Sequence, residues 1–168
     1  MFAAQCHLGI LNINITMLNV SNQRLTNLKN TQTNLVLLYN MNCIIVDDNK
    51  MARMAMKQLI SQVNDLELIA ECEDAIHAWN ILQKEKIDLI LLDIEMKGMS
   101  GIELTQKLKG SSTLIIFTTA KTEYAVEAFE LSVVDYLVKP VSPARFLQAI
   151  ARAKETVESK AGKLVILR

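Results

Sequence analysis

The chain has 168 residues, of which 51% are hydrophobic and 21% charged, so it can build the core of one ordinary domain and is not largely disordered. Lys plus Arg equals Asp plus Glu at 18 each, and no apolar run is as long as a membrane span, which removes the usual reasons to expect nucleic acid or a membrane as the main partner. Three distant cysteines without a CxxC pair favour buried thiols in a reducing compartment over a disulfide or metal framework, and we expect a cytoplasmic protein.

Residues 1–40 differ in composition from the rest of the chain. They are rich in Asn and Thr, carry only Arg24 and Lys29 as charges, and contain no acid. Asn interrupts the stretch "LGILNINITMLNV" too often for the apolar core of a signal peptide. We interpret residues 1–40 as an N-terminal extension, a non-native or mis-started leader ahead of a natural start at Met41. An extra strand or a partner-binding arm is the alternative, but no chemistry in the segment supports it.

From Met41 onward, short β-type runs alternate with stretches of helical periodicity. The expected strands are 42–46, 66–72, 88–93, 113–119 and 133–138, and the expected helices are 50–63, 74–82, one around 104–108, 123–131 and 142–158. Five β-α units with nearly continuous apolar strands imply a parallel sheet covered on both faces. Five units are too few for an eight-stranded barrel, so we predict an α/β fold with an open, doubly wound, five-stranded sheet.

Two helices carry side chains whose environment can be predicted. In helix 50–63 the apolar residues at helical spacing are Met51, Met54, Ala55, Leu59 and Val63. We expect this methionine-rich face to belong to the core rather than to a ligand surface. The same expectation holds for Trp79, whereas His77 is expected to face solvent.

The most informative residues follow the expected strands. In an open α/β sheet the functional crevice lies outside the carboxyl ends of the strands, where the strand order reverses. The residues that this chain places there are Asp47 and Asp48 after the first strand, Asp93 at the end of the third, Thr118 and Thr119 at the end of the fourth, and Lys139 after the fifth.

These residue types favour phosphoryl chemistry. Three neighbouring carboxylates repel one another, and a hard divalent cation such as Mg²⁺ resolves the conflict because it prefers oxygen ligands. A hydroxyl from Thr119 and an ammonium from Lys139 suit phosphoryl oxygens. His7 lies in the leader and His77 on a helix, so neither offers a general base at the strand ends. The carboxylates, hydroxyl and ammonium at the strand ends fit attack on phosphorus by the carboxylate of Asp93, which gives an acyl phosphate.

Two simpler interpretations compete with this one. The run "LILLDIE" imitates the acid-ended strand of a Walker-type ATPase, but no GxxxxGK[ST] phosphate loop occurs in the chain. Asp47 and Asp48 could also be a helix N-cap with an idle neighbour, and for an isolated pair this is the better interpretation. The presence of Asp93, Thr119 and Lys139 at the other strand ends reverses that preference.

Residues 41–159 resemble the receiver domain of two-component response regulators, which has a flavodoxin-like fold. The resemblance is carried by "VDDN", "LLDIEMKGMSG", "FTTA" and "DYLVKP", in this order and each at a strand end. It implies that Asp93 is the phosphoacceptor and that Mg²⁺ is the required cofactor. It further implies that Asp48 binds the metal directly, that Asp47 acts through water or as a second ligand, and that Glu95 contributes its backbone carbonyl.

The resemblance also implies a switch. Thr119, rather than Thr118, would close on the phosphoryl group, and Lys139 would pair with the acids before phosphorylation and with phosphate afterwards. Tyr136 would be the aromatic side chain whose rotamer reports the change. The Lys139–Pro140 bond would be cis, because X–Pro is the bond type in which cis costs little.

Four positions near the acceptor are distinctive. Lys97 stands where the family usually has Pro, and its ammonium could alter Mg²⁺ affinity or the dephosphorylation rate. Glu95 places a charge two residues after Asp93, a position that in receivers tends to tune the lifetime of the phosphoryl group. Gly98 and Gly101 are expected to keep this loop permissive.

The resemblance implies a signalling switch rather than an enzyme, with at most self-catalysed phosphoryl transfer and autodephosphorylation. A sensor histidine kinase would phosphorylate Asp93, and the face formed by 123–131, 133–138 and 142–158 would change its affinity for partners, including a second copy of the chain.

The segment from "FTTA" to "LQAI" is most similar to receivers of the LytTR group, whose output domain binds DNA. We expect residues 160–168 to be a linker or the start of a missing output domain, with "KLVILR" as its first strand. DNA binding would then come only through that missing domain, and truncation is favoured over a stand-alone receiver.

Two alternatives remain from other classes. A degenerate receiver that serves as an interaction adaptor would have lost an acid, the hydroxyl or the lysine, and this chain keeps all of them. A hydrolase of the haloacid dehalogenase type would need an acid two residues after its nucleophile, which Glu95 imitates, and a cap insertion that these short connections lack.

Overall fold

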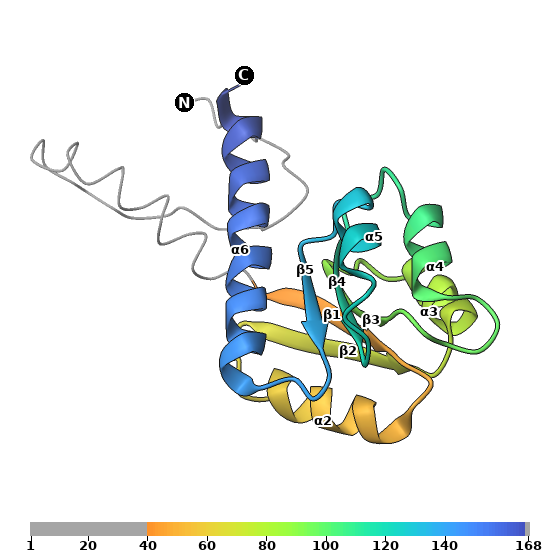
Figure 1. The fold of residues 1–168 in the computed structure, drawn as a ribbon. Coiled ribbons are helices and arrows are strands. Elements are labelled where there is room, and N and C mark those ends of the chain that lie inside the picture. The colour runs from red at the N-terminus through yellow and green to blue at the C-terminus, as the bar shows by residue number, and fades with distance from the viewer. Residues whose placement is uncertain (1–39, 167–168) are drawn as a thin grey trace, which may run out of the picture. The chain divides into compact units, whose positions relative to one another are not determined.

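The computed structural model describes residues 40–166, in which five strands and five helices alternate (Figure 1). The predicted extension 1–40 lies outside the described residues except for Asn40. The strands are β1 (Met41–Val46), β2 (Leu66–Cys72), β3 (Leu89–Asp93), β4 (Leu114–Thr119) and β5 (Asp135–Val138). The helices are α2 (Lys50–Ile60), α3 (Ala75–Leu82), α4 (Gly101–Lys107), α5 (Ala125–Glu130) and α6 (Pro143–Ile166).

The five strands form one parallel sheet in the order β2-β1-β3-β4-β5, which confirms the predicted doubly wound architecture. All residues of β3 and β4 are buried, as expected for strands covered on both faces. The chain passes from β1 to β2 on one side and then to β3 on the other, so the strand order reverses at β1. The ends of β1 and β3 therefore lie side by side at the switch point of the sheet.

Side chains alternate between two cores, one on each face of the sheet. The first core holds Leu91 and Ile116 together with Phe146 of α6 and Leu59 of α2. In the second core, Phe117 and the strand residues that point to the same face of the sheet pack against α3, α4 and α5. Figure 1 shows α2 and α6 apart from the group formed by α3, α4 and α5. Burial of both faces locks the register of the strands, because a shift by one residue would exchange the two cores.

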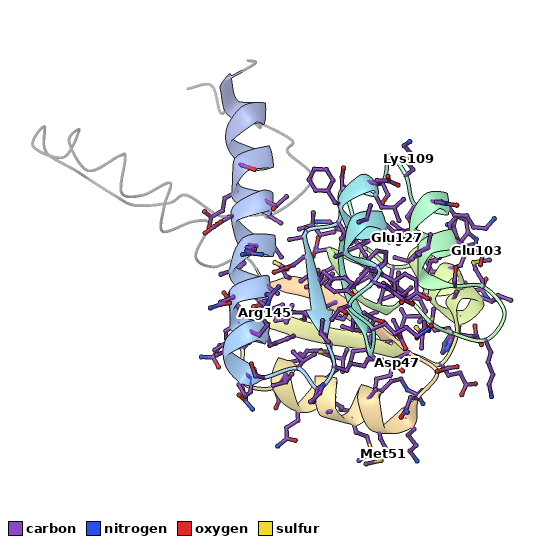
Figure 2. All side chains as sticks on the ribbon, viewed as in Figure 1. Asp47, Met51, Glu103, Lys109, Glu127 and Arg145 are labelled. Atoms are coloured by element: carbon purple, nitrogen blue, oxygen red, sulfur yellow. The ribbon has the colours of Figure 1, made fainter. Side chains whose placement is uncertain are left out.

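The buried face of α2 differs from the predicted one. Met51 and Met54 are 70% and 53% exposed, and Met51 projects away from the sheet (Figure 2). The expectation that these methionines belong to the core is wrong. The buried face is rotated around the helix from the predicted one: Met56, Leu59 and Ile60 are buried, whereas Met51 and Met54 lie on the exposed side. On α3, Trp79 is half-buried against the second core and His77 is exposed, as predicted.

Helix α6 is longer than the predicted helix 142–158, since it continues to Ile166. The strand predicted for "KLVILR" is therefore wrong for residues 163–166, which are helical. No proline interrupts the segment, and a short apolar run is compatible with either structure until its context is known. The assignment of residues 160–168 to a linker or a further domain stays a prediction.

An ion-pair network around the buried carboxylate of Asp135 attaches α6 to β5. The Arg145 guanidinium donates two hydrogen bonds to the carboxylate of Asp135, at 2.6 and 2.8 Å, and a third to the Tyr136 carbonyl at 2.9 Å. Arg152 binds the same carboxylate at 3.1 Å. Burial alone would raise the pKa of Asp135, but hydrogen bonds from Arg145 and from the Tyr136 amide, together with the charges of Arg145 and Arg152, hold the pKa below the usual range.

We expect Asp135→Asn to lower the free energy of unfolding by about 2 kcal/mol at pH 7, measured by urea denaturation, because the arginines lose their buried anionic partner. Because the folded-state pKa of Asp135 is depressed, its contribution exists above the unfolded pKa of about 3.9 and disappears as the pH falls through the folded value. The matched control is Asp65→Asn, which removes the partly exposed Lys154 pair and should cost less than about 1 kcal/mol. Equal losses for the two variants would contradict the special role of Asp135.

The described cysteines, Cys43 and Cys72, are free and buried, as predicted. Burial raises the pKa of Cys43 to about 12 and that of Cys72 to about 11, so both thiols stay protonated. Cys6 lies outside the described residues. Between residues 40 and 166, none of the helices combines the length and the hydropathy of a membrane span.

Candidate functional site

Three aspartates converge at the carboxyl ends of β1 and β3. One carboxylate oxygen each from Asp47, Asp48 and Asp93 lies within 4.8 Å of the other two. Asp47 and Asp93 are 3% and 6% exposed, whereas Asp48 is open to solvent. Asp47 lies beside the first turn of α2 (Figure 2). The structure thus brings together the three acids that the sequence predicted for this edge of the sheet.

Lys139 connects two of these acids. Its ammonium lies 2.6 Å from the Asp47 carboxylate and 2.9 Å from that of Asp93. The Lys139 amide donates to the Thr119 carbonyl at 2.7 Å, which fixes the backbone from which the side chain reaches the acids. The next peptide bond, Lys139–Pro140, is cis, as predicted.

Burial and neighbouring charges shift the pKa values of Asp93 and Lys139. Burial raises the pKa of Asp93, and the hydrogen bond and charge of Lys139 only partly offset this. For Lys139, burial acts to lower the pKa, but the hydrogen bonds and charges of Asp47 and Asp93 raise it above the ordinary value. Lys139 therefore stays charged at neutral pH and stabilises the ionised form of Asp93.

Backbone amides of neighbouring loops also donate hydrogen bonds to Asp47 and Asp48. The Asn49 amide donates to the Asp47 carboxylate at 2.8 Å. The N-cap of α2 is Asn49, whose side chain accepts from the amides of Met51 and Ala52, so the interpretation of Asp47 and Asp48 as a helix cap is wrong. Asp48 accepts from the Lys97 amide at 3.3 Å. A proline at position 97 would lack this amide, so the departure from the family pattern supplies a donor to an acid of the site.

Gly101 has a different role from the expected loop flexibility. It is the first residue of α4, and its amide donates to the Ile94 carbonyl at 3.0 Å. A Cβ at this position would lie 2.2 Å from the carbonyl oxygen of Asp93, far inside van der Waals contact. Gly98, in contrast, has a φ of +80°, where glycine serves its usual conformational purpose. Gly101 therefore allows the first turn of α4 to pack directly on the backbone of Asp93.

The predicted switch residues lie next to the acids. Thr118 is the ladder partner of Asp93, and Thr119 follows it as the buried last residue of β4. The Thr119 hydroxyl accepts from the Lys121 amide at 3.2 Å. Tyr136 is half-buried, and its hydroxyl donates to the Lys121 carbonyl. Both candidate switch side chains are thus tied to the backbone of one residue, Lys121.

Lys121 and Tyr124 also contact the site, although no motif in the sequence predicted it. The Lys121 ammonium lies 2.5 Å from the Glu95 carboxylate, and the Tyr124 hydroxyl donates to the same carboxylate at 3.1 Å. The sequence held one clue to this contact. Glu95 follows Asp93, the last residue of β3, by two residues, and Lys121 follows Thr119, the last residue of the adjacent β4, by two residues.

The charges of the site match a divalent cation. Three carboxylates against one ammonium leave a formal charge of −2 at the crevice. The ligand atoms are all oxygens, which Mg²⁺ prefers, and the exposed Asp48 leaves access for the waters that Mg²⁺ retains. The residues present therefore fit a hard divalent cation better than a soft metal.

Comparisons with known proteins agree with this geometry. The family model for the response regulator receiver domain matches residues 43–151. The sensory transduction protein LytT of Oceanobacillus iheyensis is 37% identical over 121 residues, which cover 70% of this chain and 49% of LytT. The transcriptional regulatory protein BtsR of Escherichia coli K12 is 35% identical over 113 residues, which cover 67% of this chain and 47% of BtsR. The chain spans about half the length of the curated relatives it matches.

Solved structures give the same result. The response regulatory domain of protein mrkE from Klebsiella pneumoniae has a TM-score of 0.65 and 32% identity, covering 71% of this chain and 99% of that domain. The REC domain of AraT, a response regulator from Geobacillus stearothermophilus, has a TM-score of 0.66 and 29% identity, covering 73% of this chain and 98% of that domain. The chain therefore belongs to the response regulator receiver family of two-component systems. Relatives named LytT and LytR agree with membership in the LytTR group.

Proposed function

We propose that this chain is a phosphoacceptor switch in which a sensor histidine kinase phosphorylates Asp93. The observation that carries the proposal is the placement of the Lys139 ammonium between the carboxylates of Asp47 and Asp93. An oxygen of Asp93 attacks phosphorus, the bond from phosphorus to the donor nitrogen or oxygen breaks, and the electron pair leaves with the donor. Lys139 is close enough to follow the charge from the carboxylate to the new phosphoryl oxygens.

Mg²⁺ is the cofactor that this site would take. Asp48, Asp47 and Asp93 would hold it with their carboxylates, and Glu95 would add its backbone carbonyl. The bound ion would supply positive charge for the phosphoryl oxygens. The Glu95 amide meanwhile donates to the Asp93 carboxylate at 3.4 Å, which helps to orient the acceptor oxygen.

Phosphorylation would then shift the domain between two arrangements. Thr119 and Lys139 would move toward the new charge, and Tyr136 would change its contacts between β4 and β5. The affected face consists of α5, β5 and α6. On α5, Val126 and Phe129 are 65% and 86% exposed, so this face offers apolar surface to a partner or to a second copy of the chain.

The output of the switch is inferred from the relatives' names and lengths. Relatives named as a transcriptional regulatory protein and as sensory transduction proteins are about twice as long as the matched segment. We therefore expect the switch to control a LytTR-type DNA-binding domain outside this chain, in the cytoplasm, with no nucleic acid bound by the receiver itself. An adaptor function without phosphorylation is the alternative.

The decisive experiment is incubation with acetyl phosphate and Mg²⁺, followed by intact-mass measurement of wild type and Asp93→Asn. We expect a gain of one phosphoryl group in wild type alone. A protein that gains no phosphoryl group would favour the adaptor, and continuous turnover of a generic phosphate ester would favour the hydrolase.

The Asp93→Asn variant should remain folded, so that its failure to be phosphorylated is interpretable. Burial raises the pKa of Asp93, and an acid with a raised folded-state pKa destabilises the fold as the pH rises above the unfolded value of about 3.9. Replacing it by a neutral isostere is therefore expected to leave the melting temperature at pH 7 unchanged or higher. A lower melting temperature would mean that the ion pair with Lys139 outweighs the cost of burying the charge.

A further inference from the structure

The ion pair between Glu95 and Lys121 adjoins the site, two residues after Asp93 and two after Thr119, and has no role in the phosphoryl transfer described above. It joins the loop after β3 to the loop after β4, with the two charged atoms 2.5 Å apart. Tyr124 adds its hydroxyl to the Glu95 carboxylate at 3.1 Å, and its ring lies 5.9 Å from the Lys121 ammonium. Glu95 thus has two partners on one neighbouring loop.

Glu95 is a fourth acid beside an already acidic cluster. Its amide donates to the Asp93 carboxylate, so its backbone adjoins the acceptor. Its carboxylate adds a fourth formal negative charge beside the three aspartates, and it is contacted by the Lys121 ammonium and the Tyr124 hydroxyl. Left unpaired, this charge would oppose the arrival of an anionic phosphoryl donor.

The backbone of Lys121 is anchored where its ammonium can bind Glu95. Its amide donates to the Thr119 hydroxyl at 3.2 Å, and its carbonyl accepts from the Tyr136 hydroxyl. Glu123 also lies 3.7 Å from the Lys121 ammonium, but it is on the same loop as Lys121, between β4 and α5, and is more exposed than Glu95. Lys121 therefore has two acidic neighbours, of which only Glu95 adjoins the acceptor.

We propose that Lys121 is a positioning residue for phosphorylation, which binds the Glu95 carboxylate and neutralises it so that its charge does not repel the phosphoryl donor. This inference rests on the proposed function. If Lys121 contacted the donor directly, it would speed phosphorylation whether or not Glu95 were charged. In the proposed role, Lys121 speeds phosphorylation only while Glu95 is charged.

A double-mutant cycle separates these two roles. The rate of Asp93 phosphorylation by acetyl phosphate is measured with saturating Mg²⁺ in wild type, Lys121→Met, Glu95→Gln and the double variant. We expect Lys121→Met to be slower by about fivefold, the size appropriate for one uncompensated charge near a solvent-exposed site. In the Glu95→Gln background the same substitution should have almost no effect.

Two further arms exclude a purely structural explanation. The deficit of Lys121→Met should shrink as the ionic strength rises, because salt screens exposed charges, and Lys121→Arg should retain the wild-type rate. The matched control is Glu123→Gln, which should not rescue Lys121→Met although Glu123 also neighbours the ammonium. Melting temperatures of all variants should lie close to wild type, because exposed ion pairs contribute little stability.

The outcomes distinguish this inference from the proposed function. If wild type gains no phosphoryl group, both are overturned. If wild type is phosphorylated but the Lys121→Met deficit persists in the Glu95→Gln background, or no deficit exists, only the role of Lys121 is overturned.

Discussion

Gly101→Ala is expected to lower the free energy of unfolding by about 3 kcal/mol and to slow phosphorylation of Asp93 at least tenfold. The added Cβ would lie 2.2 Å from the Asp93 carbonyl oxygen, 3.0 Å from its carbonyl carbon and 3.1 Å from the Ile94 Cα. All three are backbone atoms, so no flexible side chain can move aside. Either the first turn of α4 withdraws or the acceptor residue shifts, and a displacement near 1 Å is enough to disturb in-line attack.

The matched control for this prediction is Gly110→Ala. Gly110 has a φ of +91°, but a Cβ there would meet no atom within 4 Å. It follows Lys109, which lies at the opposite end of the domain from Asp47 (Figure 2). We expect a loss of about 1 kcal/mol from backbone strain and an unchanged rate of phosphorylation. Urea denaturation and the acetyl phosphate assay test both variants, and equal effects on the rate would contradict the close-approach argument.

Much of the site could be predicted from the sequence because a parallel sheet brings the carboxyl ends of its strands to one edge. Asp47 and Asp93 are far apart in the chain, yet both end buried apolar runs, and Lys139 follows another. The residue types then limited the chemistry to oxygen ligands and an ammonium. What the pattern could not supply was the strand order, which makes β1 and β3 neighbours and allows Lys139 to bridge their acids.

The errors have a common physical origin in tertiary context. Helical periodicity indicated an apolar face on α2 but not which side of the helix packs against the sheet, so Met51 and Met54 were assigned to the core although they are exposed. The apolar end of α6 was assigned to a strand because a short run of Leu, Val and Ile suits both structures. Gly101 looked like a loop residue, and only the packing of α4 on Asp93 shows why a side chain is not tolerated there.

Contacts between loops were the least accessible to prediction. The pair of Lys121 and Glu95 depends on the relative position of two connections after different strands, and neither residue belongs to an apolar pattern. The Lys97 amide that binds Asp48 is equally invisible, because any residue except proline would supply it. Such contacts determine how the acids are oriented, whereas the pattern of strands determines only that they meet.

Lys139→Met is expected to lower the free energy of unfolding by about 3 kcal/mol at pH 7 in the absence of divalent cations. The substitution leaves the buried carboxylates of Asp47 and Asp93 facing each other without the ammonium that now lies 2.6 and 2.9 Å from them. The folded-state pKa of Lys139 is raised. Its contribution to the free energy of unfolding is therefore fully present below the unfolded pKa of about 10.4 and is lost only as the pH rises through the folded-state pKa. The deficit of the variant should shrink at acid pH as Asp93, whose pKa is raised by burial, takes up a proton.

Mg²⁺ provides the test that separates a metal site from a simple ion pair. With Lys139 removed, the three acids carry one more uncompensated negative charge, so they should bind Mg²⁺ more tightly than in wild type. We expect millimolar Mg²⁺ to raise the melting temperature of Lys139→Met more than that of wild type, while Lys109→Met, at the far end of the domain (Figure 2), responds like wild type. An equal response in all three proteins would mean that the acids do not act together as a cation site, and Lys139 would then only neutralise them.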